Sequence, residues 1–138
     1  MNDKTVVDAN VIFSSLVSNS SKIWRGFSRQ GVIFITPNFV IVELFKHFER
    51  IKKASQLPED EILELLSKIV GKLKFYEEEL ISIGSWVEAN RLCREVDEKD
   101  TPYLALALEL NAKLWTNDKK LKEGLIKRGF NNFYEPFQ

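Results

Sequence analysis

The stretch Thr5-Val6-Val7-Asp8-Ala9-Asn10 shows the pattern on which the fold depends. Its β-branched run predicts a short strand that ends at Asp8, and residues 11–16 then have the apolar spacing of a helix. The same alternation of apolar runs and helical segments continues to about residue 134. Strands separated by helices are typical of a parallel sheet covered on both faces. We therefore expect an α/β fold, a three-layer sandwich with a central parallel sheet of four to five strands.

The remaining elements follow from apolar periodicity and from turn residues. Further strands are predicted over residues 32–35, 73–76 and 113–116, with a last edge strand over 130–134. Helices are predicted around residues 23–27, 40–51, 58–70, 86–96, 103–110 and 118–126. No repeat, low-complexity tract or linker divides the chain, so we expect one domain over residues 1–138.

The composition argues against several classes of protein. Lys and Arg number 20, as do Asp and Glu, so coating of nucleic acid through bulk positive charge is disfavoured. Cys93 is the single cysteine and His47 the single histidine, which excludes an internal disulfide and argues against a Ser-His-Asp triad. Neither a signal peptide nor a membrane-spanning run is expected, so the sequence predicts a soluble cytoplasmic protein. Carboxylates are the abundant reactive groups.

Acidic residues follow the predicted strands. Asp8 ends the first strand, and Asp118 comes just after the strand over residues 113–116. Asp100 starts a later helix, and Asp97 lies three residues before it. Ligands of open parallel sheets bind at the carboxyl ends of the strands, which makes these acids candidates for a site. Each is also a common helix N-cap type, so capping stays an alternative for every one of them taken alone.

Glu43 needs a separate explanation. It lies within Val40-Ile41-Val42-Glu43-Leu44-Phe45, where all its neighbours are apolar, and it is not at the start of the predicted helix. Burial of an unpaired carboxylate costs several kcal/mol. Glu43 must therefore face solvent, pair with a cation or bind a metal.

Several carboxylates at one edge of a sheet would repel one another. Two unit charges ~4 Å apart at an effective dielectric of 20 interact by roughly 4 kcal/mol. A hard divalent cation offsets this repulsion, and Mg²⁺ or Mn²⁺ suits a site built from carboxylates alone. Such a cation activates water and neutralises charge on a phosphodiester. The residue pattern thus favours phosphodiester chemistry that requires no His, Cys or Ser.

Four stretches in this order resemble the PIN domain, a compact α/β nuclease fold. They are Val6-Val7-Asp8-Ala9-Asn10, Glu43 within an apolar helix, Asp100 followed by Pro102-Tyr103-Leu104-Ala105-Leu106-Ala107, and Leu114-Trp115-Thr116-Asn117-Asp118. Each stretch is weak alone, whereas the ordered set is fairly specific. The resemblance extends from about residue 5 to about residue 135.

The resemblance implies a metal-dependent endoribonuclease that hydrolyses RNA with Mg²⁺ or Mn²⁺. The acidic catalytic and metal-binding set carried over from the family is Asp8, Glu43, Asp100 and Asp118. The supporting residues are Asn10, Asp97, Thr116 and Asn117. Many stand-alone members of this length are toxins of toxin–antitoxin pairs, so the resemblance also implies a small antitoxin partner.

Basic residues come just after two of these acids. Lys46 and Arg50 follow Glu43, and Lys119 follows Asp118, which places them where they could contact phosphates. A solvated helix face is the alternative for each of them, because acidic residues are interleaved.

Other features bear on packing and on partners. His47 is predicted to be a surface or hydrogen-bonded histidine rather than a metal ligand, and Cys93 a small buried hydrophobe. The three tryptophans are predicted to pack in the core. The aromatic tail either docks on the domain or lies between subunits, and we expect a homodimer. Its residues are Phe130, Phe133, Tyr134 and Phe137.

Other functions fit the acidic pattern less well. A haloacid-dehalogenase-type phosphatase needs a second Asp two residues after the first, where this chain has Asn10. A phospho-acceptor receiver domain needs paired acids after the first strand and an acceptor Asp at a middle strand end, where Ile35-Thr36-Pro37 offers none. A non-catalytic PIN-like module that binds RNA or protein stays open as the alternative, although the four acids weigh against it.

Overall fold

The computed structural model describes residues 3–18 and 21–136, and four parallel strands form its sheet. The strands are β1 (Asp3–Val7), β2 (Val32–Pro37), β3 (Leu73–Tyr76) and β4 (Lys113–Trp115), in the order β3-β2-β1-β4. β1 is central, because Val6 lies opposite Ile35 of β2 on one side and Leu114 of β4 on the other. The predicted parallel sheet is confirmed.

The strands alternate with helices along the chain. The helices are α1 (Ala9–Ser18), α2 (Ser21–Phe27), α3 (Val40–Lys46), α4 (Phe48–Ser55), α5 (Glu59–Val70), α6 (Ile83–Cys93), α7 (Thr101–Leu110) and α8 (Lys119–Lys127). Two short 3₁₀ turns, η1 (Glu78–Leu80) and η2 (Glu98–Asp100), precede α6 and α7. No helix within residues 3–18 and 21–136 combines the length and apolar character that crossing a bilayer requires.

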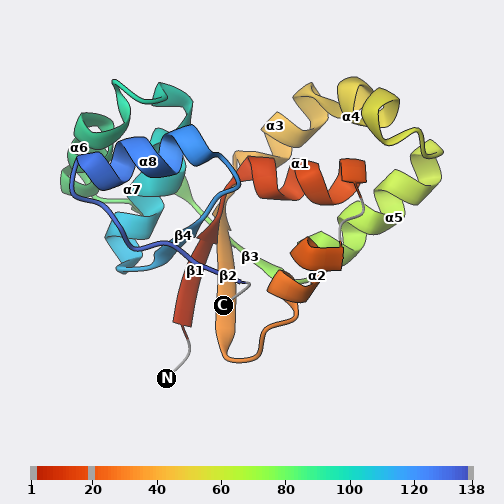
Figure 1. Ribbon diagram of the computed structural model, residues 1–138, viewed down its shortest axis with the longest axis horizontal. Coiled ribbons are helices and arrows are strands. Elements are labelled where there is room, and N and C mark those ends of the chain that lie inside the picture. The colour runs from red at the N-terminus through yellow and green to blue at the C-terminus, as the bar shows by residue number, and fades with distance from the viewer. Residues whose placement is uncertain (1–2, 19–20, 137–138) are drawn as a thin grey trace.

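The helices cover both faces of the sheet in two layers. Figure 1 shows α1 to α5 on one side of the strands and α6 to α8 on the other. The chain runs from β1 through β2 to β3 toward one edge, and then returns to β4 on the far side of β1. Because parallel crossovers are right-handed, this reversal of direction moves the later helices to the opposite face. The predicted three-layer sandwich follows from that reversal.

Helix α7 is the innermost helix of its layer, where it packs on β1, β2 and β4. Its residues from Tyr103 to Ala107 are all buried. Ala105 and Ala107 add little bulk, so the helix can approach the sheet closely. Burial of this apolar run fixes the start of α7, and with it Asp100, near the carboxyl ends of the strands.

Aromatic rings fill the opposite part of the core. The ring of Trp115 lies 4.7 Å from that of Phe27 and 5.0 Å from that of Tyr134, measured between centroids. Phe130 and Tyr134 are buried, so the described part of the aromatic tail docks on the sheet. Phe137 lies outside the described residues. Trp24 and Trp86 pack against the core at its margin, and Cys93 is fully buried as predicted.

The prediction of one helix over residues 40–51 is wrong. His47 has φ −107° and ψ 13°, so α3 ends before it and α4 begins after it. The ring of Phe13 on α1 meets the His47 ring edge-on at 5.8 Å, and α4 packs along α1. Apolar spacing continues across the break, which is why the sequence pattern did not show it.

Two other boundaries differ from the prediction. The expected edge strand over residues 130–134 is reduced to one parallel bridge between Leu114 and Phe133. The helix predicted to start near residue 86 begins one turn earlier, because Ser82 caps α6 by accepting a hydrogen bond from the Ser85 N–H at 3.3 Å. It ends at Cys93 rather than at residue 96.

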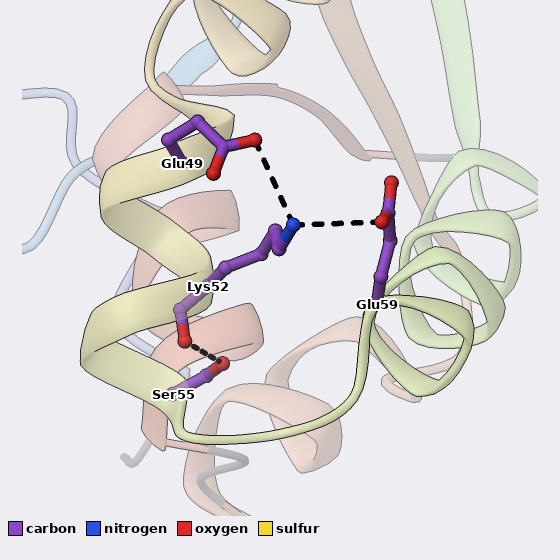
Figure 2. Close-up of polar contacts among 4 residues, drawn as sticks. All are labelled: Glu49, Lys52, Ser55 and Glu59. Atoms are coloured by element: carbon purple, nitrogen blue, oxygen red, sulfur yellow. Dashed lines mark hydrogen bonds and ion pairs between the residues drawn. The ribbon is translucent and has the colours of Figure 1, made fainter.

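The turn between α4 and α5 is tied by one lysine. Lys52 Nζ lies 3.6 Å from a carboxylate oxygen of Glu49 and 3.4 Å from one of Glu59, and the Ser55 hydroxyl donates to the Lys52 carbonyl at 3.1 Å (Figure 2). Exposed ion pairs of this kind contribute about 0–1 kcal/mol. The chain turns from α4 toward α5 at Gln56, whose φ of 59° lies in the left-handed region.

Candidate metal centre

The candidate site lies where the order of the strands changes direction. β1 and β4 are neighbours, yet the chain leaves β1 toward β2 and reaches β4 only after β3. The backbone N–H of Asp8 donates to the Trp115 carbonyl at 3.0 Å, so Asp8 continues the pairing of these two strands at their carboxyl ends. Open α/β sheets bind their ligands at such a switch point.

Polar side chains on the two strand ends hold Asp8 in place. The Thr116 hydroxyl donates to Asp8 Oδ2 at 2.9 Å and accepts the Asp118 N–H at 3.1 Å. Asn10 Nδ2 lies 3.5 Å from the same hydroxyl, and Asn10 Oδ1 accepts the Asn117 N–H at 3.3 Å. The predicted supporting residues Asn10, Thr116 and Asn117 thus join Asp8 to the loop that carries Asp118.

Three further carboxylates gather beside Asp8. Asp97, Asp100 and Asp118 each offer one oxygen, and these oxygens lie within 4.8 Å of one another. Asp118 also caps α8, because its Oδ1 accepts the Leu121 N–H at 3.1 Å. Asp97 likewise caps η2, whereas Asp100 occupies the N-cap position of α7 without a capping hydrogen bond. Capping therefore explains one oxygen of Asp118 and of Asp97, and it does not explain Asp100.

Glu43 approaches the site from α3 and meets a tyrosine. The Tyr103 hydroxyl donates to Glu43 Oε1 at 2.8 Å. Sequence reasoning foresaw a cation, a metal or solvent as the partner of Glu43 and missed Tyr103. The sequence held one indication of this contact: a tyrosine on the apolar face of a helix needs a hydrogen-bond partner for its hydroxyl. Burial and the charge of Glu43 raise the pKa of Tyr103, so its hydroxyl stays protonated and donates.

Burial and crowding raise the pKa of two acids. Desolvation raises the pKa of Asp8 from 3.8 to about 6, against the hydrogen bond from Thr116. Desolvation, followed by the charges of Asp8, Asp97, Asp118 and Glu43, raises the pKa of Asp100 from 3.8 to about 8. Asp100 thus experiences the charges of Asp8, Asp97, Asp118 and Glu43, while the oxygens of Asp97, Asp100 and Asp118 approach one another most closely.

The donor set suits a hard divalent cation. The clustered side chains supply only oxygen atoms, and their mutual repulsion is what a cation would relieve. Mg²⁺ and Mn²⁺ prefer such oxygen ligands, while zinc and copper favour the imidazole and thiolate groups that this cluster lacks. The oxygens of Asp97, Asp100 and Asp118 are spaced closely enough for one such cation, and Asp8 and Glu43 add negative charge beside them.

Two of the three predicted basic residues line hollows at the site. Lys46 lines a depression of about 440 Å³ that also includes Glu43 and Lys99. Lys119 lines a smaller hollow next to Asp118. Arg50, exposed on α4, lies in neither of these hollows. His47 is half-buried at the rim of the larger depression.

Comparison with known proteins agrees with this architecture. A family model described as a PIN domain matches residues 6–133. VapBC2 from Rickettsia felis, solved bound to a DNA fragment from its promoter, has a chain of similar structure with a TM-score of 0.64 and 17% identity. That match covers 96% of this chain and 97% of the other. PAE2754 from Pyrobaculum aerophilum gives a TM-score of 0.62 and 15% identity, over 88% and 79% of the two chains.

The family match covers most of the chain, and the protein belongs to the PIN-domain family, a family of nucleases. No curated protein matches the sequence. The solved structures share the fold at low identity, so they support the architecture rather than a particular substrate.

Proposed function

We propose that residues 1–138 form a single nuclease domain that hydrolyses RNA phosphodiester bonds with Mg²⁺ or Mn²⁺. The observation that carries this proposal is the approach of Asp97, Asp100 and Asp118 oxygens to within 4.8 Å of one another. The cluster adjoins buried Asp8 at the switch point of a PIN fold. Carboxylates crowded in this way destabilise a protein unless they bind a cation.

The proposed roles of the residues follow from their positions. Asp8, Glu43, Asp100 and Asp118 would hold the cation, which would supply activation of water and neutralisation of charge on the phosphate. Thr116 fixes Asp8 through its hydroxyl. Asn10 and Asn117 hold the loop after β4, and Asp97 adds a carboxylate beside those of Asp100 and Asp118.

The basic side chains are proposed to bind the RNA backbone. Lys46 lines the hollow that includes Glu43, and Lys119 lines the hollow that includes Asp118, so both can contact phosphates near the scissile bond. Arg50 lies on α4 and lines neither hollow, so it can contact only RNA that extends past them.

We also propose a small antitoxin partner, a cytoplasmic location and a homodimer. The similarity to a chain of VapBC2, a toxin–antitoxin pair, supports the antitoxin. Exposed apolar residues support the homodimer, since Val42 and Phe45 on α3 and Ile83 and Val87 on α6 all lie at the surface. A hydrogen bond of 2.7 Å from the Phe39 N–H to the Glu78 carboxylate joins the segments that precede α3 and α6.

The test is cleavage of a structured RNA mixture by the purified chain, with Mn²⁺ or with EDTA. We expect cleavage with Mn²⁺ and none with EDTA. Asp100→Asn keeps the shape of the side chain and removes its charge. We expect it to lower the rate more than about 100-fold, because loss of a group that merely supports a metal ligand already costs 10–100-fold. Asp60→Asn, an exposed acid on α5, is the matched control and should cleave like the wild type.

Two results would contradict the proposal. Cleavage that persists in EDTA and in Asp100→Asn would identify a contaminating nuclease. RNA binding without cleavage by the wild type at any Mn²⁺ concentration would favour the non-catalytic PIN-like module instead.

A further inference from the structure

The contact between Tyr103 and Glu43 joins two elements that are far apart in sequence. Tyr103 lies on α7, one turn after Asp100, and Glu43 lies on α3. The hydroxyl of Tyr103 is 2.8 Å from Glu43 Oε1, and the tyrosine is only 2% exposed. The start of one helix therefore carries both a clustered acid and the group that holds Glu43.

Tyr103 itself is held on a second side. Its ring lies 5.4 Å from that of Phe39, measured between centroids. Phe39 precedes α3, and its carbonyl accepts the Glu43 N–H at 3.1 Å. The backbone that carries Glu43 and the ring that binds its carboxylate are thus packed as one unit.

Competing partners for Glu43 lie close by. Lys46 and His47 are three and four residues further along the chain, the spacing at which side chains on a helix meet. Lys99 lines the same depression as Glu43. Among the described residues, Glu43 forms no ion pair with Lys46, His47 or Lys99 and instead accepts the tyrosine hydroxyl.

We propose that Tyr103 is a positioning residue for Glu43. Its hydroxyl binds one carboxylate oxygen, which leaves the second oxygen for a metal and keeps Glu43 from pairing with Lys46. A neutral donor is suited to this task, since a lysine in its place would cancel the charge that attracts the cation. The inference rests on the proposed metal-dependent function.

The test replaces the hydroxyl alone, with Tyr103→Phe. Binding of Mn²⁺ is followed by the electron paramagnetic resonance signal of the free ion, which does not depend on RNA. We expect Tyr103→Phe to weaken Mn²⁺ binding roughly tenfold, the usual effect of removing a hydrogen-bond partner from a metal ligand. In the Glu43→Gln background, Tyr103→Phe should cause no further loss. Lys46→Gln, which removes a competing cation, should restore part of the affinity of Tyr103→Phe.

Tyr134→Phe is the matched control, because it also removes a buried hydroxyl, one that donates to the Gly26 carbonyl at 2.7 Å. Its Mn²⁺ affinity should equal that of the wild type. Wild-type affinity in Tyr103→Phe, or an equal loss in Tyr134→Phe, overturns the inference and leaves the proposed function standing. A wild-type chain that neither binds Mn²⁺ nor cleaves RNA overturns both.

Discussion

Asp100 shows how a residue can sit at a helix start for a reason other than capping. It occupies the N-cap position of α7 and makes no capping hydrogen bond, while Asp118 caps α8 with one oxygen. A cap contributes about 1 kcal/mol, so the cap made by Asp118 offsets part of the repulsion that this residue experiences. Asp100 has no such compensation, and its raised pKa indicates that the folded protein holds its charged form at an electrostatic cost.

This cost makes stability depend on pH when metal is absent. The pKa of Asp100 is about 8 in the folded protein and near 3.8 in the unfolded chain, and that of Asp8 is about 6 when folded. As pH rises from about 4 to about 8, the unfolded chain releases protons that the folded protein retains, so the free energy of unfolding falls. We expect the melting temperature in EDTA to fall across this range, and Asp100→Asn to flatten the decline.

Thermal melts of both proteins in EDTA at a series of pH values check this expectation. Added Mn²⁺ should reverse the trend, since it binds the ionised carboxylates and its stabilising effect grows with pH. An equally steep decline in Asp100→Asn would show that other groups cause the pH dependence.

At the scale of elements, α8 and the segment before η2 are fitted closely together. Gly124 on α8 faces Val96, and a Cβ at Gly124 would lie 2.7 Å from one Val96 methyl and 2.8 Å from the other. Val96 directly precedes Asp97, and α8 begins at the Asp118 cap. This close contact joins the two segments that carry Asp97 and Asp118.

Gly124→Ala should destabilise the protein, although alanine is the better helix former. The gain in helix propensity is about 1 kcal/mol, whereas overpacking of a close contact costs typically about 1–3 kcal/mol. We expect a lower free energy of unfolding in urea and weaker Mn²⁺ binding, because α8 must move away from Val96.

Gly71→Ala is the control for this substitution. Gly71 has φ −63°, and the atoms nearest to a Cβ added there would lie 3.5 Å away, so alanine should be neutral or stabilising. A stabilised Gly124→Ala would mean that Val96 moves aside without loss of packing.

At the scale of the whole molecule, the order of the strands brings the acidic residues together. Apolar side chains of α3 and α6 are exposed at the surface. The reversal between β3 and β4 brings the ends of β1 and β4 together, and α7 and α3 close the site from the two helical layers (Figure 1). Ile83 and Val87 on α6 line neither hollow beside the acids, whereas Val42 on α3 lines the depression that includes Glu43. Exposed apolar patches of this kind commonly mark protein interfaces.

If these faces pair two copies, a charge placed there should separate them. Ile83 is 76% exposed on α6, and we expect Ile83→Glu to convert a dimer into a monomer in sedimentation velocity. Ile126→Glu is the control, because Ile126 is 49% exposed on α8 and should leave the dimer intact. A wild-type chain that sediments as a monomer, or dissociation by both variants alike, would argue against this interface.

Local patterns along the chain were enough to predict the class of the fold and the approximate strands, and they placed three acids of the proposed site at the ends of those elements. Apolar runs and helical spacings are properties of neighbouring residues, and Asp8, Asp100 and Asp118 stand at element boundaries that such neighbours define. The break at His47, the second role of Asp118 as a cap and the partner of Glu43 depended instead on packing between distant segments. Tyr103 and Glu43 are 60 residues apart, and they meet because α3 and α7 belong to different helical layers that come together here, an arrangement that no local pattern encodes.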